Sequence, residues 1–303
     1  MGSNCTMRLE YPLTSDFLTT SMTCPLSFKK ILSQECGLSV SQVRILLCLD
    51  RFDDVCTGKT LASRLSLSVP TVASALSSLE TSGLVRRKED PEDRRRNYVE
   101  LTEIGRKQIQ DVDEVLSGAI TSLWGDSVDM LAQDVLLYGA ELMDSGMGRP
   151  MRSYEGGDKN YDSSYVESYF EAFYQFGKIL GAFNLTRNEF RLLFELYGKG
   201  HGERLGSLSS TLIMRLSEIT SVSDRLVERD LVSRSRDKLD RRSVRIKLTE
   251  EGEALICKAA ESLDSAFCHG FGSYDVAYGQ RCVFLDTAAR LAEAQRKKFN
   301  PYH

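Results

Sequence analysis

The chain of 303 residues contains an internal repeat. A shift of 147 positions aligns residues 38–105 with residues 185–252 without a gap, and 20 of these 68 positions are identical. One of the longest matches pairs Asp93-Arg94-Arg95 with Asp240-Arg241-Arg242. Because unrelated segments would not keep one register over so many positions, the repeat indicates one domain present twice in a single chain.

Each copy begins with the sequence signature of a helix N-terminus. Ser39 with Gln42 forms a capping box in the first copy, and Thr186 with Glu189 forms one in the second. Apolar residues at helical spacing follow each box. Two further helices are predicted after this one, the first of them short.

After the third helix of each copy, the apolar pattern changes from helical to alternating. Residues 84–101 and 231–248 each predict two strands around a charged turn. Thr102 and Thr249 then stand where the N-cap of a following helix is expected. This order is that of a winged helix-turn-helix unit. We therefore expect a mainly α fold with small β-hairpin wings.

A polar segment between the copies gives the expected domain boundaries. Residues 145–162 are rich in Gly, Ser, Asp and Lys and include Pro150, which is typical of a linker. The first unit is expected over residues 1–144 and the second over 163–303. Long helices outside the winged cores are expected to join the units through a pseudo-dimer interface, so that the fused chain acts as a monomeric pseudo-dimer.

The helices that lead the two copies are expected to differ. Residues 163–182 show a helical pattern rich in aromatic side chains. Residues 14–24 are rich in Thr and Ser, and Pro25 follows them. Because proline interrupts the helical hydrogen-bond ladder and favours the first helical turn, the leading helix of the first copy is expected only over about Pro25–Cys36.

The run from Thr71 to Val85 resembles the recognition helix and first wing strand of the MarR family of bacterial transcription regulators. Residues 90–105 are similar to the wing signature of that family, and residues 240–242 and 248–252 repeat it. The chain resembles two such subunits fused in tandem. The resemblance implies a sequence-specific regulator of transcription that binds double-stranded DNA, and a repressor that a small ligand relieves.

Two sets of side chains are expected to contact DNA. Small polar residues on a recognition helix face base edges in the major groove, and a wing arginine can enter a narrow minor groove. The recognition-helix candidates are Thr71, Ser74, Ser77, Ser78, Ser217, Thr220, Ser221 and Arg225. The wing candidates are Arg94, Arg95, Arg96, Arg241, Arg242 and Arg245.

The formal net charge of −4 hides a local asymmetry. Residues 86–96 carry six basic and four acidic side chains, a net +2, whereas residues 234–247 carry seven and two, a net +5. We therefore expect a DNA operator with two unequal half-sites. The second copy is expected to contribute more of the electrostatic affinity.

Two modes of control are open. The resemblance implies a pocket beside the leading helix for a small phenolic or lipophilic ligand, although the same aromatic residues also suit an ordinary core. The candidate lining residues are Tyr165, Tyr169, Phe173 and Tyr174. Some members of the family sense oxidants through a cysteine near the leading helix, which makes Cys24 and Cys36 candidates for a redox-sensing regulator.

Other classes of function find little support in the composition. Three histidines and no C-x-x-C pair give no metal-ligand set or catalytic triad, so neither an enzyme nor a cofactor is expected. The longest apolar stretches, such as residues 45–49, cannot span a bilayer, and no signal peptide is recognisable, which predicts a cytoplasmic protein. A winged unit that binds a protein partner is the alternative to DNA binding.

Overall fold

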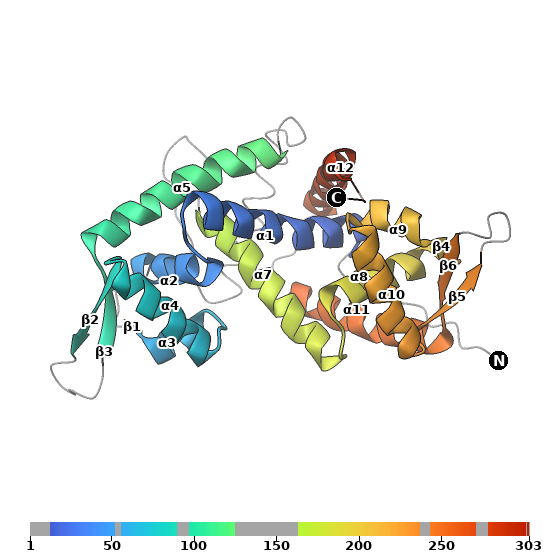
Figure 1. The fold of residues 1–303 in the computed structure, drawn as a ribbon, viewed down its shortest axis with the longest axis horizontal. Helices are drawn as coiled ribbons and strands as arrows, with labels where there is room; N and C mark the ends of the chain where they lie inside the picture. Colours follow the sequence, from blue (N-terminus) through green and yellow to red (C-terminus); the bar gives the residue numbers. More distant parts are fainter. Residues whose placement is uncertain are drawn as a thin grey trace. The chain divides into compact units, whose positions relative to one another are not determined.

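The computed structural model describes residues 13–51, 56–89, 97–124, 163–236, 243–270, 278–300 and 302. Within these ranges the chain is mainly helical and contains two small antiparallel sheets, as the sequence predicts (Figure 1). The elements of the first copy are α1 (Ser15–Glu35), α2 (Val40–Arg51), β1 (Cys56–Thr57), α3 (Gly58–Arg64), α4 (Val69–Thr81), β2 (Val85–Glu89), β3 (Asn97–Leu101) and α5 (Glu103–Trp124). Those of the second are α7 (Ser163–Ala182), α8 (Arg187–Lys199), β4 (Glu203–Arg204), α9 (Leu205–Leu212), α10 (Leu216–Glu228), β5 (Val232–Arg236), β6 (Val244–Leu248), α11 (Glu250–Gly270) and α12 (Tyr278–Lys298).

The described residues form two compact units. The first winged unit contains residues 24–124 and 163–174, and the second winged unit contains residues 13–23 and 175–302. Helices α1 and α7 therefore each contribute residues to both units. The boundaries expected from the sequence, and the pseudo-dimer interface between long helices, stay predictions.

In the first winged unit, α2, α3 and α4 lie beside a sheet with strand order β1-β3-β2 (Figure 1). Strands β2 and β3 pair from Val85 opposite Leu101 to Glu89 opposite Asn97, which confirms the predicted hairpin. Strand β1 adds a third, two-residue strand that the sequence did not predict, because two residues are too few to show an alternating pattern.

The second winged unit repeats this arrangement with strand order β4-β6-β5. Strands β5 and β6 pair from Val232 opposite Leu248 to Arg236 opposite Val244, which is the register of the first hairpin shifted by 147 positions. Apolar side chains of α8 and α10 form the centre of the core, and Phe190 and Leu226 have no exposed surface. The sequence repeat is therefore also a structural repeat.

The predicted helix caps are present in both units. The Ser39 and Thr186 hydroxyls accept the backbone N–H of Gln42 and Glu189, and the side chains of Gln42 and Glu189 accept the backbone N–H in return. The threonines that follow the two hairpins cap α5 and α11, each accepting a backbone N–H at 3.0 Å. Local sequence therefore sets where these helices begin.

Gly105 and Gly252 occupy the first turns of α5 and α11, where each helix meets the preceding hairpin. A Cβ atom at Gly105 would collide with the carbonyl oxygen of Leu84, and one at Gly252 would collide with that of Leu231. Both positions therefore require glycine because the backbones approach too closely for any side chain.

The prediction that the first leading helix covers only about Pro25–Cys36 is wrong. Helix α1 begins at Ser15 and continues through Pro25. Tertiary packing overrides the local preference, since most side chains of this segment are buried. The buried side chains of α1 before the proline are Phe17, Leu18, Thr19, Thr20, Ser21, Met22 and Cys24. The Thr20 hydroxyl also donates to the carbonyl oxygen of Ala288 in α12, at 3.1 Å.

A buried arginine stands at the same place in both units. Arg44 has its guanidinium 5.1 Å from the centre of the Tyr174 ring. Arg191 donates to the carbonyl oxygen of Leu212 at the end of α9, and burial lowers the pKa of its guanidinium to about 10. Each arginine therefore joins the first core helix of its unit to a neighbouring segment.

Candidate nucleic-acid interface

Helices α4 and α10 are the recognition helices predicted from the sequence. The Ser68 hydroxyl caps α4 by accepting the backbone N–H of Thr71 at 3.2 Å, and Pro70 follows in the first turn. At the start of α10, the Glu218 carboxylate accepts the backbone N–H of Arg215 at 3.2 Å. A turn of four residues separates α3 from α4, and a turn of three separates α9 from α10, which is the spacing of a helix-turn-helix.

All eight recognition-helix candidates lie on exposed faces. Those on α4 are Thr71, Ser74, Ser77 and Ser78, and those on α10 are Ser217, Thr220, Ser221 and Arg225. The opposite face of each helix is buried, with Leu79 and Leu226 fully enclosed. A recognition helix needs such an exposed polar face to contact base edges. The role of each of these side chains stays a prediction.

A side-chain link that the sequence analysis missed joins each recognition helix to the first turn of the preceding core helix. In the first unit, the Gln42 amide donates to the Ser78 hydroxyl at 2.9 Å. In the second unit, Arg225 Nε donates to Glu189 Oε1 at 3.0 Å. Gln42 and Glu189 are equivalent in the repeat, as are Ser78 and Arg225. The same contact is therefore a neutral hydrogen bond in the first unit and an ion pair in the second. The capping boxes revealed Gln42 and Glu189, but no sequence signal identified their partners on α4 and α10.

The carboxylate of Glu189 is buried and remains charged. Burial by itself would raise its pKa, but hydrogen bonds from Thr186 and Arg225 hold the pKa below its ordinary value. Arg229 adds a second guanidinium, 3.8 Å from the other carboxylate oxygen. A buried anion therefore fixes two cations against the start of α8.

A second link joins each wing to its recognition helix. Arg87 on β2 pairs with Glu80 on α4 at 3.2 Å. The equivalent Arg234 on β5 pairs with Asp224 on α10 and also donates to the Ser223 hydroxyl. The sequence pointed to this contact only through the presence of arginine at both equivalent positions of the repeat.

The outer faces of the two wings differ in charge. In the first unit, Glu100 pairs with Arg86 at 2.9 Å and with Lys88 at 3.3 Å, and these contacts, that of Arg86 foremost, lower its pKa. Lys247 stands at the equivalent position in the second unit. The described strands of the first wing carry three basic and two acidic side chains, a net +1, whereas those of the second carry four basic ones, a net +4.

The tips of both wings lie outside the described residues, and with them five predicted DNA contacts. These are Arg94, Arg95, Arg96, Arg241 and Arg242. The sixth, Arg245, lies on β6 and donates from Nη1 to the carbonyl oxygen of Gly202 at 2.8 Å. Its guanidinium therefore supports the loop before β4.

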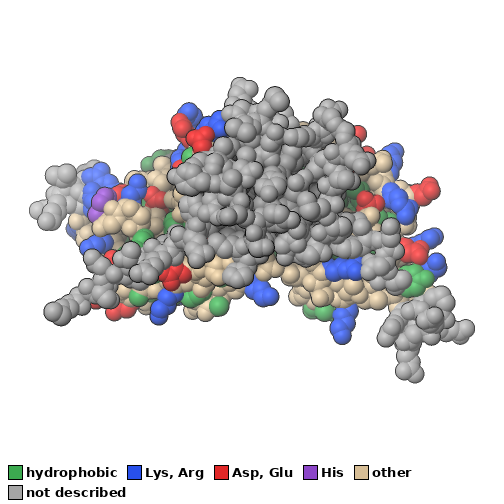
Figure 2. All heavy atoms as spheres, turned by 180° about the vertical axis from the view of Figure 1, so that it is seen from behind, with side chains coloured by type: hydrophobic (Ala, Val, Ile, Leu, Met, Phe, Trp, Pro, Cys, Tyr) green, Lys and Arg blue, Asp and Glu red, His purple; other side chains and the backbone are tan. Residues whose placement is uncertain are grey.

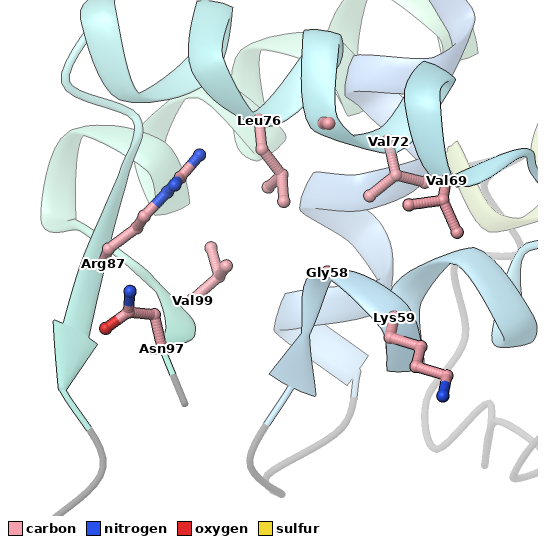
Figure 3. A pocket seen from close by; sticks show the side chains of 9 residues that line it. Gly58, Lys59, Val69, Val72, Leu76, Arg87, Asn97 and Val99 are labelled. Carbon is pink, nitrogen blue, oxygen red and sulfur yellow. The ribbon is translucent and has the colours of Figure 1, made fainter. Parts of the chain in front are cut away.

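A pocket of about 210 Å³ lies between α3, α4 and the hairpin of the first unit. Val69, Val72 and Leu76 point into it from α4, and Arg87 reaches it from β2 (Figure 3). The residue equivalent to Leu76 in the second unit is Ser223, whose hydroxyl accepts a hydrogen bond from Arg234, the equivalent of Arg87.

The residues predicted to line a ligand pocket do not line this one. The side chains of Tyr165 and Tyr169 lie outside the described residues. Phe173 and Tyr174 are half-buried on α7, and their rings contact edge to face with centroids 6.2 Å apart. Neighbouring Phe170 and Phe176 are buried in the core. A ligand role for the predicted residues stays a prediction.

The two predicted redox cysteines do not have the features of a reactive thiol. Cys24 is buried on α1. Burial raises the pKa of the half-exposed Cys36 thiol, and the carboxylates of Glu35 and Asp111 raise it further. Because the thiolate is the reactive form, these surroundings favour the less reactive state.

The described residues add two findings on other classes of function. They contain no group of three His, Cys, Asp or Glu side chains arranged to hold a metal ion. None of the described helices is both long and apolar enough to cross a membrane. On the face drawn in Figure 2, acidic side chains lie among the basic ones.

Together, the helix order, the exposed second helix of each pair and the hairpin that follows define two winged helix-turn-helix units. Residues 37–96 match the family described as the MarR family, and residues 175–258 match the family described as transcriptional regulator SarA/Rot. The chain thus contains two tandem winged helix-turn-helix units, of which the first is similar to MarR-family domains and the second to SarA/Rot-type domains.

Several known proteins are similar to parts of the chain. It is 37% identical over 90 residues to the uncharacterized HTH-type transcriptional regulator YpoP of Bacillus subtilis (strain 168), covering 30% of this chain and 63% of YpoP. It is 38% identical over 82 residues to YhbI of the same organism, a protein of the same description, covering 27% of this chain and 53% of YhbI. The chain therefore spans between about half and two thirds of these relatives.

Two solved structures also match parts of the chain. The crystal structure of MarR is 28% identical, with a TM-score of 0.33, and the match covers 36% of this chain and 82% of that one. The crystal structure of the S. aureus MepR–DNA complex is 26% identical, with a TM-score of 0.30, and the match covers 36% of this chain and 80% of that one.

Proposed function

We propose that this chain is a transcription regulator that binds double-stranded DNA sequence-specifically and uses its two winged units on unequal halves of one operator. The observation that carries the proposal is the presence, in both units, of an exposed polar recognition helix beside a hairpin with net positive charge. The family matches point to the same class of protein. Within this proposal, the fused chain acts as a pseudo-dimer and represses until a small ligand releases it.

The charge difference between the wings predicts which half-site depends more on salt. Each lysine or arginine that neutralises a phosphate adds about one unit to the slope of affinity against salt concentration on logarithmic axes. The described strands carry net charges of +1 and +4, so the second unit is expected to supply the larger electrostatic part.

A salt titration with wing variants tests the proposal. Arg95→Ala and Arg242→Ala should each reduce the slope by about one unit, and Arg242→Ala should reduce affinity more. Equal losses of affinity would contradict the asymmetry. If the parent chain binds no promoter fragment at low salt, the winged units instead serve a protein partner.

A further inference from the structure

The second recognition helix holds one arginine in a fixed and accessible position. Arg225 Nε donates to Glu189 Oε1 at 3.0 Å, and Nη1 donates to Ser221 Oγ, also at 3.0 Å. The Glu189 side chain is 4% exposed, whereas that of Arg225 is 46% exposed. A buried carboxylate therefore anchors one side of a guanidinium on a side chain that remains partly exposed.

This geometry suits the recognition of a guanine base. A planar guanidinium donates two parallel hydrogen bonds to O6 and N7 of guanine, and orienting the plane beforehand reduces the entropy lost on binding. Ser221 lies one turn before Arg225, so the guanidinium extends toward the N-terminal half of α10, the part that a recognition helix presents to bases. Because Arg229 also contacts Glu189, the cluster of one anion and two cations keeps a net charge of +1.

The first unit has no counterpart to this arginine. Its equivalent residues are Gln42, Ser78 and Ser82, none of which is charged. The Ser78 hydroxyl already accepts a hydrogen bond from the Gln42 amide. A serine also has only one O–H and cannot provide the paired donors of a guanidinium. The two units therefore differ at one defined position of the recognition surface.

We propose that Arg225, positioned by Glu189 and Ser221, reads a guanine in the half-site of the second unit, and that the first unit makes no such contact. This inference rests on the proposed function, since it names a base within the proposed operator. Arg225 is the residue that touches the base, and Glu189 is a positioning residue. The unequal half-sites then differ in sequence requirement as well as in salt dependence.

Selection from a library of randomised DNA duplexes tests the contact directly. The parent chain should enrich a guanine at one position of one half-site. Arg225→Ala should reduce that preference about tenfold, and Arg225→Lys should not restore it, because an ammonium lacks the paired donors. Replacing the selected guanine by 7-deazaguanine, which lacks the N7 acceptor, should weaken the parent and leave Arg225→Ala unaffected.

Two further variants distinguish a loss of guanine preference from a loss of the folded structure. Glu189→Gln should retain a cooperative unfolding transition and lower the guanine preference by loosening Arg225. Lys199→Ala, which removes the ion pair between the exposed Lys199 and the buried Glu195 at the other end of α8, should leave the preference intact. A guanine preference that survives Glu189→Gln unchanged would overturn the positioning role.

Transfer of the pair to the first unit is the most demanding test. The double variant Gln42→Glu with Ser78→Arg should impose a guanine on the other half-site. If the parent enriches no sequence at all, the proposed function fails. If the parent enriches a sequence and Arg225→Ala keeps the same guanine, the function stands and this inference is wrong.

Discussion

The two winged units share their backbone packing and differ in the charge of several equivalent side chains. Gly105 and Gly252 occupy the same tight contact, and the two hairpins have the same register. On the outer face of the wings, Glu100 lies opposite Arg86 in the first hairpin, and the equivalent Lys247 lies opposite Ser233 in the second, so the charge at this position is reversed. Steric restrictions thus leave few choices in the core, whereas an exposed position tolerates opposite charges and can serve different binding tasks.

The largest expected effect tests the shared backbone contact. Gly105→Ala and Gly252→Ala should each lower the free energy of unfolding by about 3 kcal/mol, because the added Cβ forces the helix away from the hairpin carbonyl. Urea denaturation measures the loss. Gly118→Ala on the same helix as Gly105 meets no atom within 4 Å and should stabilise by about 0.5–1 kcal/mol. A small effect at only one of the two glycines would break the structural equivalence of the units.

The next effect should be confined to the second unit. Glu189→Gln should lower the free energy of unfolding at pH 7 by about 2 kcal/mol, because it removes charged hydrogen bonds from a buried site. The folded pKa of Glu189 lies below its unfolded value, so its contribution is present above about pH 4.5 and is lost as the pH falls through the folded pKa.

Urea denaturation at several pH values from 7 to 3 measures this contribution. The parent should lose more stability than Glu189→Gln over that interval. The equivalent Gln42 does not titrate, so Gln42→Ala should change stability by the same amount at every pH. Parallel pH curves for the parent and Glu189→Gln would show that the carboxylate contributes no pH-dependent stability.

A smaller effect concerns the exposed charges of the wings. Lys247→Gln should reduce the salt slope of DNA binding by up to one unit. Glu100→Gln should raise the slope by up to two units, because Arg86 and Lys88 would no longer be paired with a carboxylate. Electrophoretic titration at several salt concentrations gives both slopes. If neither slope changes, the outer faces of the wings do not contact phosphate.

The smallest effect concerns Cys36. Its raised pKa lowers the thiolate fraction at pH 7.5, so alkylation should be several-fold slower than that of a small free thiol and should accelerate as the pH rises to 9. Site-resolved mass spectrometry after timed iodoacetamide treatment measures the rate. Faster alkylation of Cys36 than of the free thiol would restore the redox hypothesis.

The sequence by itself determined the repeat, the order of the elements and the faces of the recognition helices. These features depend on short-range rules. The capping box of Ser39 with Gln42 and the Thr249 cap involve residues three apart, and burial of Leu79 and Leu226 follows from helical spacing. Such signals are readable without knowledge of tertiary contacts.

Only the tertiary structure decided which distant side chains meet. Helix α1 continues through Pro25 because its first half is buried in the second unit, which outweighs the helix-breaking tendency of proline. Glu189 reaches Arg225 across 36 positions, and Arg86 meets Glu100 across 14. Local patterns cannot specify such pairs, because their distances depend on how separately formed helices and strands pack together.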